Sequence, residues 1–203
     1  MSNRCVIVGS MDVDSRILDY KDDCFFIAAD GGLKSLEEFG IKPDLVLGDF
    51  DSLGFIPNGD NVIQYPVKKN DTDMMLAVKE AITRGMTEII IFGGCGGRAD
   101  HTLANLSTMI YALKKGAKIS MIDSDAEYYI CSDEMILPLK EDYGFSVFAV
   151  GDSAKVDIDG ALYSGENITV ANDTTLGVSN AFTDRDVKIK VNKGIVMVVT
   201  TKE

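Results

Sequence analysis

Short apolar runs alternate with longer segments of helical spacing over the first 120 or so residues. The segment 100–115 is the clearest of the second kind, because Leu103, Leu106, Ile110 and Leu113 recur at the spacing of one buried helical face. The same criteria predict helices over residues 32–39, 73–84 and 100–115, and strands over residues 5–8, 25–29, 45–47, 62–65, 88–92 and 118–122. This alternation predicts a mostly parallel α/β sheet with helices on its faces.

The pattern changes beyond Asp125, where short β-rich runs are separated by turns. These runs are residues 145–150, 155–159, 167–170, 187–191 and 195–200. Residues 192–194 have the composition of a tight hairpin connection. We therefore expect two closely packed domains, an α/β domain over residues 1–124 and a smaller antiparallel β-sandwich over residues 125–203.

Two carboxylates, Asp49 and Asp51, follow the predicted strand 45–47 in the sequence GDFDS. Ligands collect outside the carboxyl ends of the strands in an open parallel sheet. Residues i and i+2 of an extended backbone point the same way, so both carboxylates could reach one hard cation. The alternative is an Asp-rich turn in which each side chain bonds its own backbone.

Two further predicted strands end in Asp or Gly clusters. Residues 25–29 run into Asp30 and two glycines, and residues 88–92 run into the loop GGCGGRADH. That loop lacks the third glycine of a dinucleotide-binding fingerprint, which argues against a dehydrogenase. Arg98 is placed to hold phosphate oxygens, Asp100 is either a cation ligand or a helix cap, and His101 is either a general base or a packing residue.

The segment KNDTD, residues 69–73, precedes a predicted helix. Asp71 stands where a helix N-cap is expected. Asp73 then either complements the helix dipole as a first-turn acid or joins Asp49 and Asp51 at the same edge of the sheet.

Composition narrows the class of protein. The 203 residues are 46% hydrophobic, which is enough for a substantial core. The net charge of −12 argues against nucleic-acid binding, so an anionic substrate would need a divalent cation and the local charge of Lys68, Lys69 and Arg98. No apolar run is long enough to cross a bilayer and the N-terminus lacks a signal-type segment, so we expect a cytoplasmic protein without membrane partners. The four widely spaced cysteines are expected to be reduced thiols.

Taken together, the motifs resemble those of the thiamine pyrophosphokinase family. They are ADGG (29–32), PDLVLGDFDS (43–52), KNDTD (69–73), GGRADH (96–101) and, more weakly, GVSN (177–180). The resemblance implies transfer of the pyrophosphoryl group from Mg-ATP to the hydroxyl of thiamine, which gives thiamine diphosphate and AMP. It also implies a homodimer with the active site at the subunit interface, and a second domain that binds thiamine and dimerises.

Residue by residue, the resemblance implies catalytic and Mg²⁺-binding roles for four aspartates, Asp49, Asp51, Asp73 and Asp100. It implies substrate-binding roles for Asp30, Lys69, Asp71, Arg98, His101, Ser179 and Asn180. Of these, Ser179 and Asn180 would approach thiamine from the partner subunit. The chain departs from some members in having no tryptophan to stack on thiamine, and Phe182 is either a substitute or a core residue.

Two other functions use the same residues. A metal-dependent phosphohydrolase would release phosphate from ATP without thiamine, and a nucleotide or thiamine-diphosphate sensor would bind without turnover. So many acids at one edge disfavour a sensor, because like charges crowd at a cost unless a cation is bound.

Overall fold

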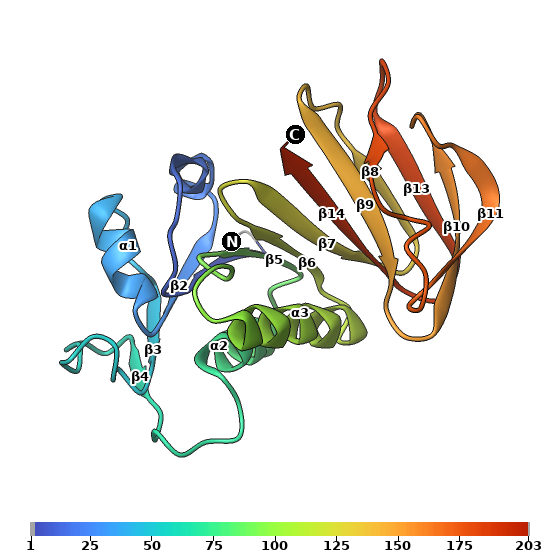
Figure 1. Ribbon diagram of the computed structural model, residues 1–203. Helices are drawn as coiled ribbons and strands as arrows, with labels where there is room; N and C mark the ends of the chain where they lie inside the picture. The colour runs from blue at the N-terminus through green and yellow to red at the C-terminus, as the bar shows by residue number, and fades with distance from the viewer. Residues whose placement is uncertain (1–2, 203) are drawn as a thin grey trace. The chain divides into compact units, whose positions relative to one another are not determined.

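Figure 1 shows the computed structural model of the protein, which describes residues 3–202. The chain divides into two compact units, Met1–Ser124 and Asp125–Glu203. No helix among the described residues is long and apolar enough to cross a membrane.

The first unit contains six parallel strands. In chain order they are β1 (Arg4–Val8), β2 (Phe25–Ala29), β3 (Leu45–Gly48), β4 (Val62–Gln64), β5 (Glu88–Phe92) and β6 (Lys118–Ile122). They lie side by side in the order β6-β5-β1-β2-β3-β4, with every neighbouring pair parallel. The predicted parallel α/β sheet is confirmed, and the strand boundaries differ from the prediction by one residue at most.

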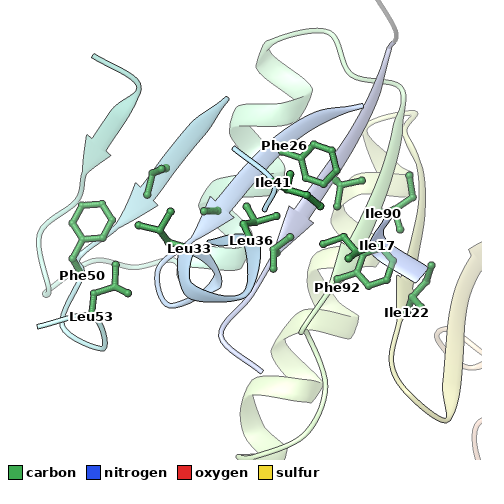
Figure 2. Packing of buried hydrophobic residues seen from close by; sticks show 14 residues of the cluster. Ile17, Phe26, Leu33, Leu36, Ile41, Phe50, Leu53, Ile90, Phe92 and Ile122 are labelled. Atoms are coloured by element: carbon green, nitrogen blue, oxygen red, sulfur yellow. The ribbon is translucent and has the colours of Figure 1, made fainter. Parts of the chain in front are cut away.

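Helices cover this sheet. α1 (Gly32–Glu38) and a short 3-10 helix (Ser15–Tyr20) contribute Leu33, Leu36 and Ile17 to one cluster of buried residues. Figure 2 shows these side chains packed with Phe26 and Phe92 of the strands. α2 (Asp73–Thr83) contacts β1, β2 and β3, α3 (Ala99–Lys114) contacts β6, and α2 and α3 contact each other. The 3-10 helix was not predicted.

The strand order has a point where the chain changes direction. From β1 the chain builds outward through β2, β3 and β4, and then returns to β5 on the other side of β1. The loops after β1 and β5 therefore leave the sheet in opposite directions. In open α/β sheets such a switch point creates the crevice in which ligands bind.

The second unit is a β-sandwich. One layer has the order β12-β9-β14-β7 and the other the order β11-β10-β13-β8, with the neighbouring strands antiparallel. Both layers contribute to one core, as Phe145 and Val198 from the first and Val156 and Ile189 from the second illustrate. The bounds are β7 (Ala126–Cys131), β8 (Glu134–Leu137), β9 (Tyr143–Ala149), β10 (Ser153–Asp159), β11 (Gly165–Ala171), β12 (Asn180–Ala181), β13 (Val187–Lys193) and β14 (Val196–Lys202).

The predicted hairpin at residues 192–194 is wrong. The turn does join β13 to β14, but β13 pairs with β10 and β8, whereas β14 pairs with β7 and β9. The chain thus crosses from one layer to the other at Gly194, whose φ is 88°. Turn residues predict a sharp bend, but they do not determine whether the strands on either side hydrogen-bond to each other.

Three strands were missed, namely β7, β8 and β12. In β7 the charged residue Glu127 interrupts the apolar run, yet the structure buries it and pairs it with Lys140 at 2.6 Å. β8 is short and half-exposed, and β12 has only two residues. None of the three has the apolar alternation that a sequence search relies on.

Candidate functional site

A pocket of about 410 Å³ opens at the carboxyl edge of the parallel sheet, at the switch point. Its walls come from the loops after β1, β2, β3 and β5 and from the first turns of α2 and α3. The lining residues are Gly9, Ser10, Met11, Ala29, Asp30, Asp51, Ser52, Thr72, Asp73, Met74, Gly93, Gly94, Gly96, Arg98, His101 and Asn105. The pocket therefore lies at the carboxyl ends of the strands, where the sequence predicted the Asp and Gly clusters.

Three carboxylates gather at this edge. Oxygen atoms of Asp30, Asp49 and Asp51 lie within 4.8 Å of one another. Asp30 follows β2 with a φ of 49°, a strained value for a residue with a side chain. Ser52 Oγ donates a 2.5 Å hydrogen bond to Asp30 Oδ2, while Asp30 Oδ1 is buried without a hydrogen-bond partner among the described residues. A buried, unpartnered carboxylate oxygen beside two other carboxylates suits a hard divalent cation.

Phe50 holds the two motif aspartates in place. Its side chain is only 3% exposed and packs in the core, as does that of Leu53, and both are visible in Figure 2. The φ of Phe50 is 63°, so the backbone between Asp49 and Asp51 is not extended. The expected proximity of the two carboxylates is therefore correct, but its reason is a left-handed turn around a buried aromatic anchor.

Lys69 joins a fourth carboxylate to this group. Its Nζ lies 2.7 Å from Asp49 Oδ2 and 2.7 Å from Asp73 Oδ1. The first contact is an aligned hydrogen bond, whereas the second is an ion pair by distance only. The side chains of Lys69 and Asp49 are 12% and 10% exposed, so the contact is largely shielded from water.

The ionisation of these groups reflects the shared ammonium. The hydrogen bond from Lys69 lowers the pKa of Asp49. Burial raises the pKa of Asp73, to which the negative charges of Asp49 and Asp30 add, and Lys69 only partly offsets this. Burial acts to lower the pKa of Lys69, but the hydrogen bond to Asp49 and the negative charges of Asp49 and Asp73 outweigh it, and the pKa is raised.

The start of α2 differs from the prediction. Its N-cap is Thr72, whose side chain accepts a hydrogen bond from Met75 N at 3.2 Å, and not Asp71. Asp71 instead pairs with Lys79 at 2.6 Å. Asp73 is the first-turn acid, as one interpretation of the sequence had it, and it also faces the pocket. A threonine between two aspartates satisfies the same capping rule, so the sequence alone does not separate the three positions.

Arg98, Asp100 and His101 stand at the start of α3, on the more exposed side of the pocket. Arg98 is the N-cap residue, and its guanidinium lies 2.6 Å from Asp100 Oδ2. This hydrogen bond lowers the pKa of Asp100 and raises that of Arg98. Asp100 Oδ1 also accepts a hydrogen bond from His101 N at 3.0 Å. The structure places Arg98 and His101 on the pocket wall, but Asp100 is not among the three clustered carboxylates.

Two loops that form the pocket floor are joined through their backbones. Gly9 N donates to Phe92 O at 2.8 Å and Met11 N donates to Gly93 O at 3.2 Å. A Cβ on Gly9 would lie 2.5 Å from Gly93 O, and Gly93 has a φ of 63°, so both positions require glycine. Gly9, Ser10 and Met11 were not predicted as site residues, although a glycine directly after the first strand was a usable signal.

Asn105 was also missed. It lies on α3, is 8% exposed, and donates from Nδ2 to Gly94 O at 2.7 Å. An asparagine inside the apolar face of a helix is a recognisable exception to the helical pattern. Its partner lies in the glycine-rich loop, which sequence spacing does not reveal.

Ser179 and Asn180 belong to the second unit. Ser179 is exposed with a φ of 60°, and its N donates to Ser146 Oγ at 3.1 Å. Asn180 is 7% exposed, and its side chain bonds the backbone N and O of Tyr163 at 2.9 and 3.0 Å. Phe182 packs on Phe145 with ring centroids 5.5 Å apart and lies half-buried against the core, whereas Tyr163 has an exposed side chain.

Comparison with known proteins agrees with this geometry. Residues 19–121 match the family described as thiamin pyrophosphokinase, catalytic domain, and residues 134–196 match thiamin pyrophosphokinase, vitamin B1 binding domain. The thiamine pyrophosphokinase of Bacillus subtilis is 29% identical over 199 residues, which cover 91% of each chain.

Solved structures are similar over almost the whole chain. The crystal structure of thiamine pyrophosphokinase from Bacillus subtilis superposes with a TM-score of 0.87 at 25% identity, covering 98% of this chain and 99% of that one. Thiamin pyrophosphokinase from Candida albicans has a TM-score of 0.79 at 11% identity, covering 99% and 90%, and so shares the fold. Since the catalytic-domain match alone spans residues 19–121 of 203, this chain belongs to the thiamine pyrophosphokinase family of enzymes.

Proposed function

We propose that the protein transfers the pyrophosphoryl group of Mg-ATP to the hydroxyl of thiamine and releases thiamine diphosphate and AMP. The observation that carries this proposal is the pocket at the switch point, where three clustered carboxylates adjoin a half-buried lysine in a chain of this family. Its volume of about 410 Å³ is in the ordinary range for a small-molecule site.

Asp30, Asp49 and Asp51 would hold Mg²⁺, since their oxygens converge and one of them is buried and unpartnered. When bound, the cation neutralises charge on the phosphate oxygens. Asp73, at the start of α2, is proposed to join these carboxylates. Asp100, at the start of α3, is proposed to join them once Arg98 leaves it to bind the substrate.

The basic groups of the pocket are proposed to bind the phosphates. Arg98 is exposed on the pocket wall, and its planar guanidinium can donate two parallel hydrogen bonds to phosphate oxygens. His101 lies on the same wall of the pocket, three residues after Arg98 in the first turn of α3. Lys69 is proposed to add a further positive charge from the side of α2. Asp71, which pairs with Lys79 of that helix, is proposed to contact the substrate as well.

Thiamine is proposed to contact the second unit of a partner subunit in a homodimer. Ser179 is proposed to touch it directly, because its hydroxyl lies on an exposed and strained turn. For Asn180 the proposed role is to shape that surface, since its amide already holds the backbone of Tyr163. Tyr163 offers an exposed aromatic ring beside this turn, which Phe182 does not.

The test is to incubate the purified protein with ATP, Mg²⁺ and thiamine and to separate the nucleotides and thiamine esters by chromatography. The proposal expects AMP and thiamine diphosphate in equal amounts, and neither when thiamine or Mg²⁺ is omitted. Formation of ADP or free phosphate without thiamine would instead identify a phosphohydrolase. Sedimentation equilibrium would test the dimer separately.

A further inference from the structure

Lys69 occupies an unusual position for a lysine. Its ammonium is held between Asp49 and Asp73 at 2.7 Å from each, and its side chain is only 12% exposed. Asp49 is also one of the three clustered carboxylates. A single residue therefore contributes to both the ion pair and the proposed cation site.

Both oxygens of Asp49 are engaged in this arrangement. Oδ2 accepts the hydrogen bond from Lys69, and Oδ1 accepts a 3.3 Å hydrogen bond from Asp51 N. A divalent cation that binds Asp49 must compete with the ammonium for the same carboxylate. The ammonium would also repel the cation, because two positive charges a few ångströms apart in a partly shielded site repel each other more strongly than they do in water.

Asp73 gives the lysine an alternative partner. Its Oδ1 lies at ion-pair distance from Nζ but without an aligned hydrogen bond, and it is fixed at the first turn of α2. Asp49 and Asp73 thus share one ammonium, while Asp30 and Asp51 lie beside Asp49 with no ion pair to Lys69 among the contacts of the described residues. Without it, the aspartates would repel one another whenever the cation is absent.

We propose that Lys69 is an exchangeable counter-ion of the cation site. In the cation-free enzyme its ammonium neutralises Asp49 and keeps the acidic group together. When a divalent cation binds, Lys69 leaves Asp49, stays anchored on Asp73, and presents its ammonium to the pocket. Its role toward phosphates rests on the proposed function, but the exchange itself requires only the cation.

The exchange is tested by titrating nucleotide-free protein with Mn²⁺ and measuring free Mn²⁺ by electron paramagnetic resonance. Lys69→Met removes the competing charge and keeps much of the side chain's bulk. We expect it to bind Mn²⁺ more tightly than wild type, on the order of tenfold for one like charge removed from a partly shielded site. Lys68→Met is the matched control, since Lys68 is the exposed neighbour, and its affinity should change by less than about twofold because exposed charges are screened. Equal or weaker Mn²⁺ binding by Lys69→Met would overturn the proposal.

A second measurement uses the wild-type protein and does not depend on the variant's folding. Brief reductive methylation followed by peptide mass spectrometry reports the accessibility of each lysine amine. Labelling of Lys69 should be low without cation and rise several-fold with saturating Mg²⁺, relative to the exposed Lys34 as an internal standard. Unchanged labelling of Lys69 would contradict the exchange even in a fully active kinase. Exchange without thiamine diphosphate formation would retain this inference and reject the proposed reaction.

Discussion

Asn105 donates a 2.7 Å hydrogen bond from the buried face of α3 to the carbonyl oxygen of Gly94. The bond ties the glycine-rich loop to the helix that follows it. The preceding residue of the same loop, Gly93, accepts a backbone hydrogen bond from Met11 in the loop after β1. The loop is therefore held from two sides although it consists largely of glycine.

Replacing Asn105 with leucine should loosen this loop and raise the KM for ATP. The substitution keeps the approximate size but leaves the Gly94 carbonyl without its partner, which costs about 1–3 kcal/mol for a buried polar group. Urea denaturation and steady-state kinetics give the two readouts. Ser107→Ala is the control, because its hydroxyl only bonds the preceding turn of the same helix at the surface. A loss of stability with an unchanged KM for ATP would reduce Asn105 to a packing role.

Phe50→Ala should destabilise the first unit and weaken cation binding together. The ring is buried and sets the turn that brings Asp49 to Asp51, so its removal leaves a cavity as well as a looser turn. The expected loss in the free energy of unfolding is about 3–5 kcal/mol. Leu36→Ala offers a comparison, since it truncates a buried residue of the same cluster away from the site. Under conditions where both variants are folded, the affinity for Mn²⁺ should fall in Phe50→Ala and should stay at the wild-type value in Leu36→Ala.

Asp51→Asn should abolish most turnover and leave the fold intact. Asp51 is exposed, so the neutral amide costs little stability, but it removes one of the three converging negative charges. Product formation from ATP and thiamine measures the first effect and thermal unfolding the second. Turnover at the wild-type rate would mean that the clustered carboxylates are not the cation site.

Gly177→Ala should distort the turn that carries Ser179. A Cβ on Gly177 would lie 2.0 Å from Val147 O, and Gly177 O accepts a 2.8 Å hydrogen bond from Val147 N. The turn must move away from β9, and we expect the KM for thiamine to rise more than the KM for ATP. Gly165→Ala is the control, because its nearest neighbour would be the flexible side chain of Ile168 at 3.3 Å. Similar changes in both KM values would argue against a thiamine surface here.

Asp14 should stabilise the protein only above acidic pH. The Arg16 side chain lowers the pKa of the Asp14 carboxyl, which also caps the 3-10 helix. A pKa lowered in the folded state gives stability that is present above the unfolded pKa and is lost as pH falls through the folded pKa. Asp14→Asn should therefore cost about 1 kcal/mol near pH 7, with the difference from wild type shrinking below about pH 4. Chemical denaturation at several pH values would measure it, and a pH-independent difference would contradict it.

The parallel sheet was predictable because each of its strands is a short apolar run bounded by polar or turn residues. Runs such as residues 88–92 are buried on both faces, and the structure returns the same bounds for β5. The sandwich was harder to predict. β7 was missed because the charged Glu127, which the structure buries and pairs, interrupts its apolar run. The turn at Gly194 gave no information about which layer the next strand joins.

The candidate site was predictable where the chemistry is local in sequence. The spacing of Asp49 and Asp51 was enough to predict their convergence, although the left-handed Phe50 produces it in a different way. The contacts of Lys69 with Asp49 and of Asn105 with Gly94 join segments that are 20 and 11 residues apart. Such contacts depend on how the loops pack at the sheet edge, which no pattern along the chain encodes.

The position of β14 determines when the second unit can fold. This strand lies between β9 and β7, and without it the layer has no central strand and β7 has no partner within that layer. During synthesis, β7 and β9 can therefore be joined in this layer only once residues 196–202 have left the ribosome. The parallel sheet, whose strands all precede Asp123, has no such dependence on the end of the chain. The two units should then acquire their structure at different times, with the sandwich completed last.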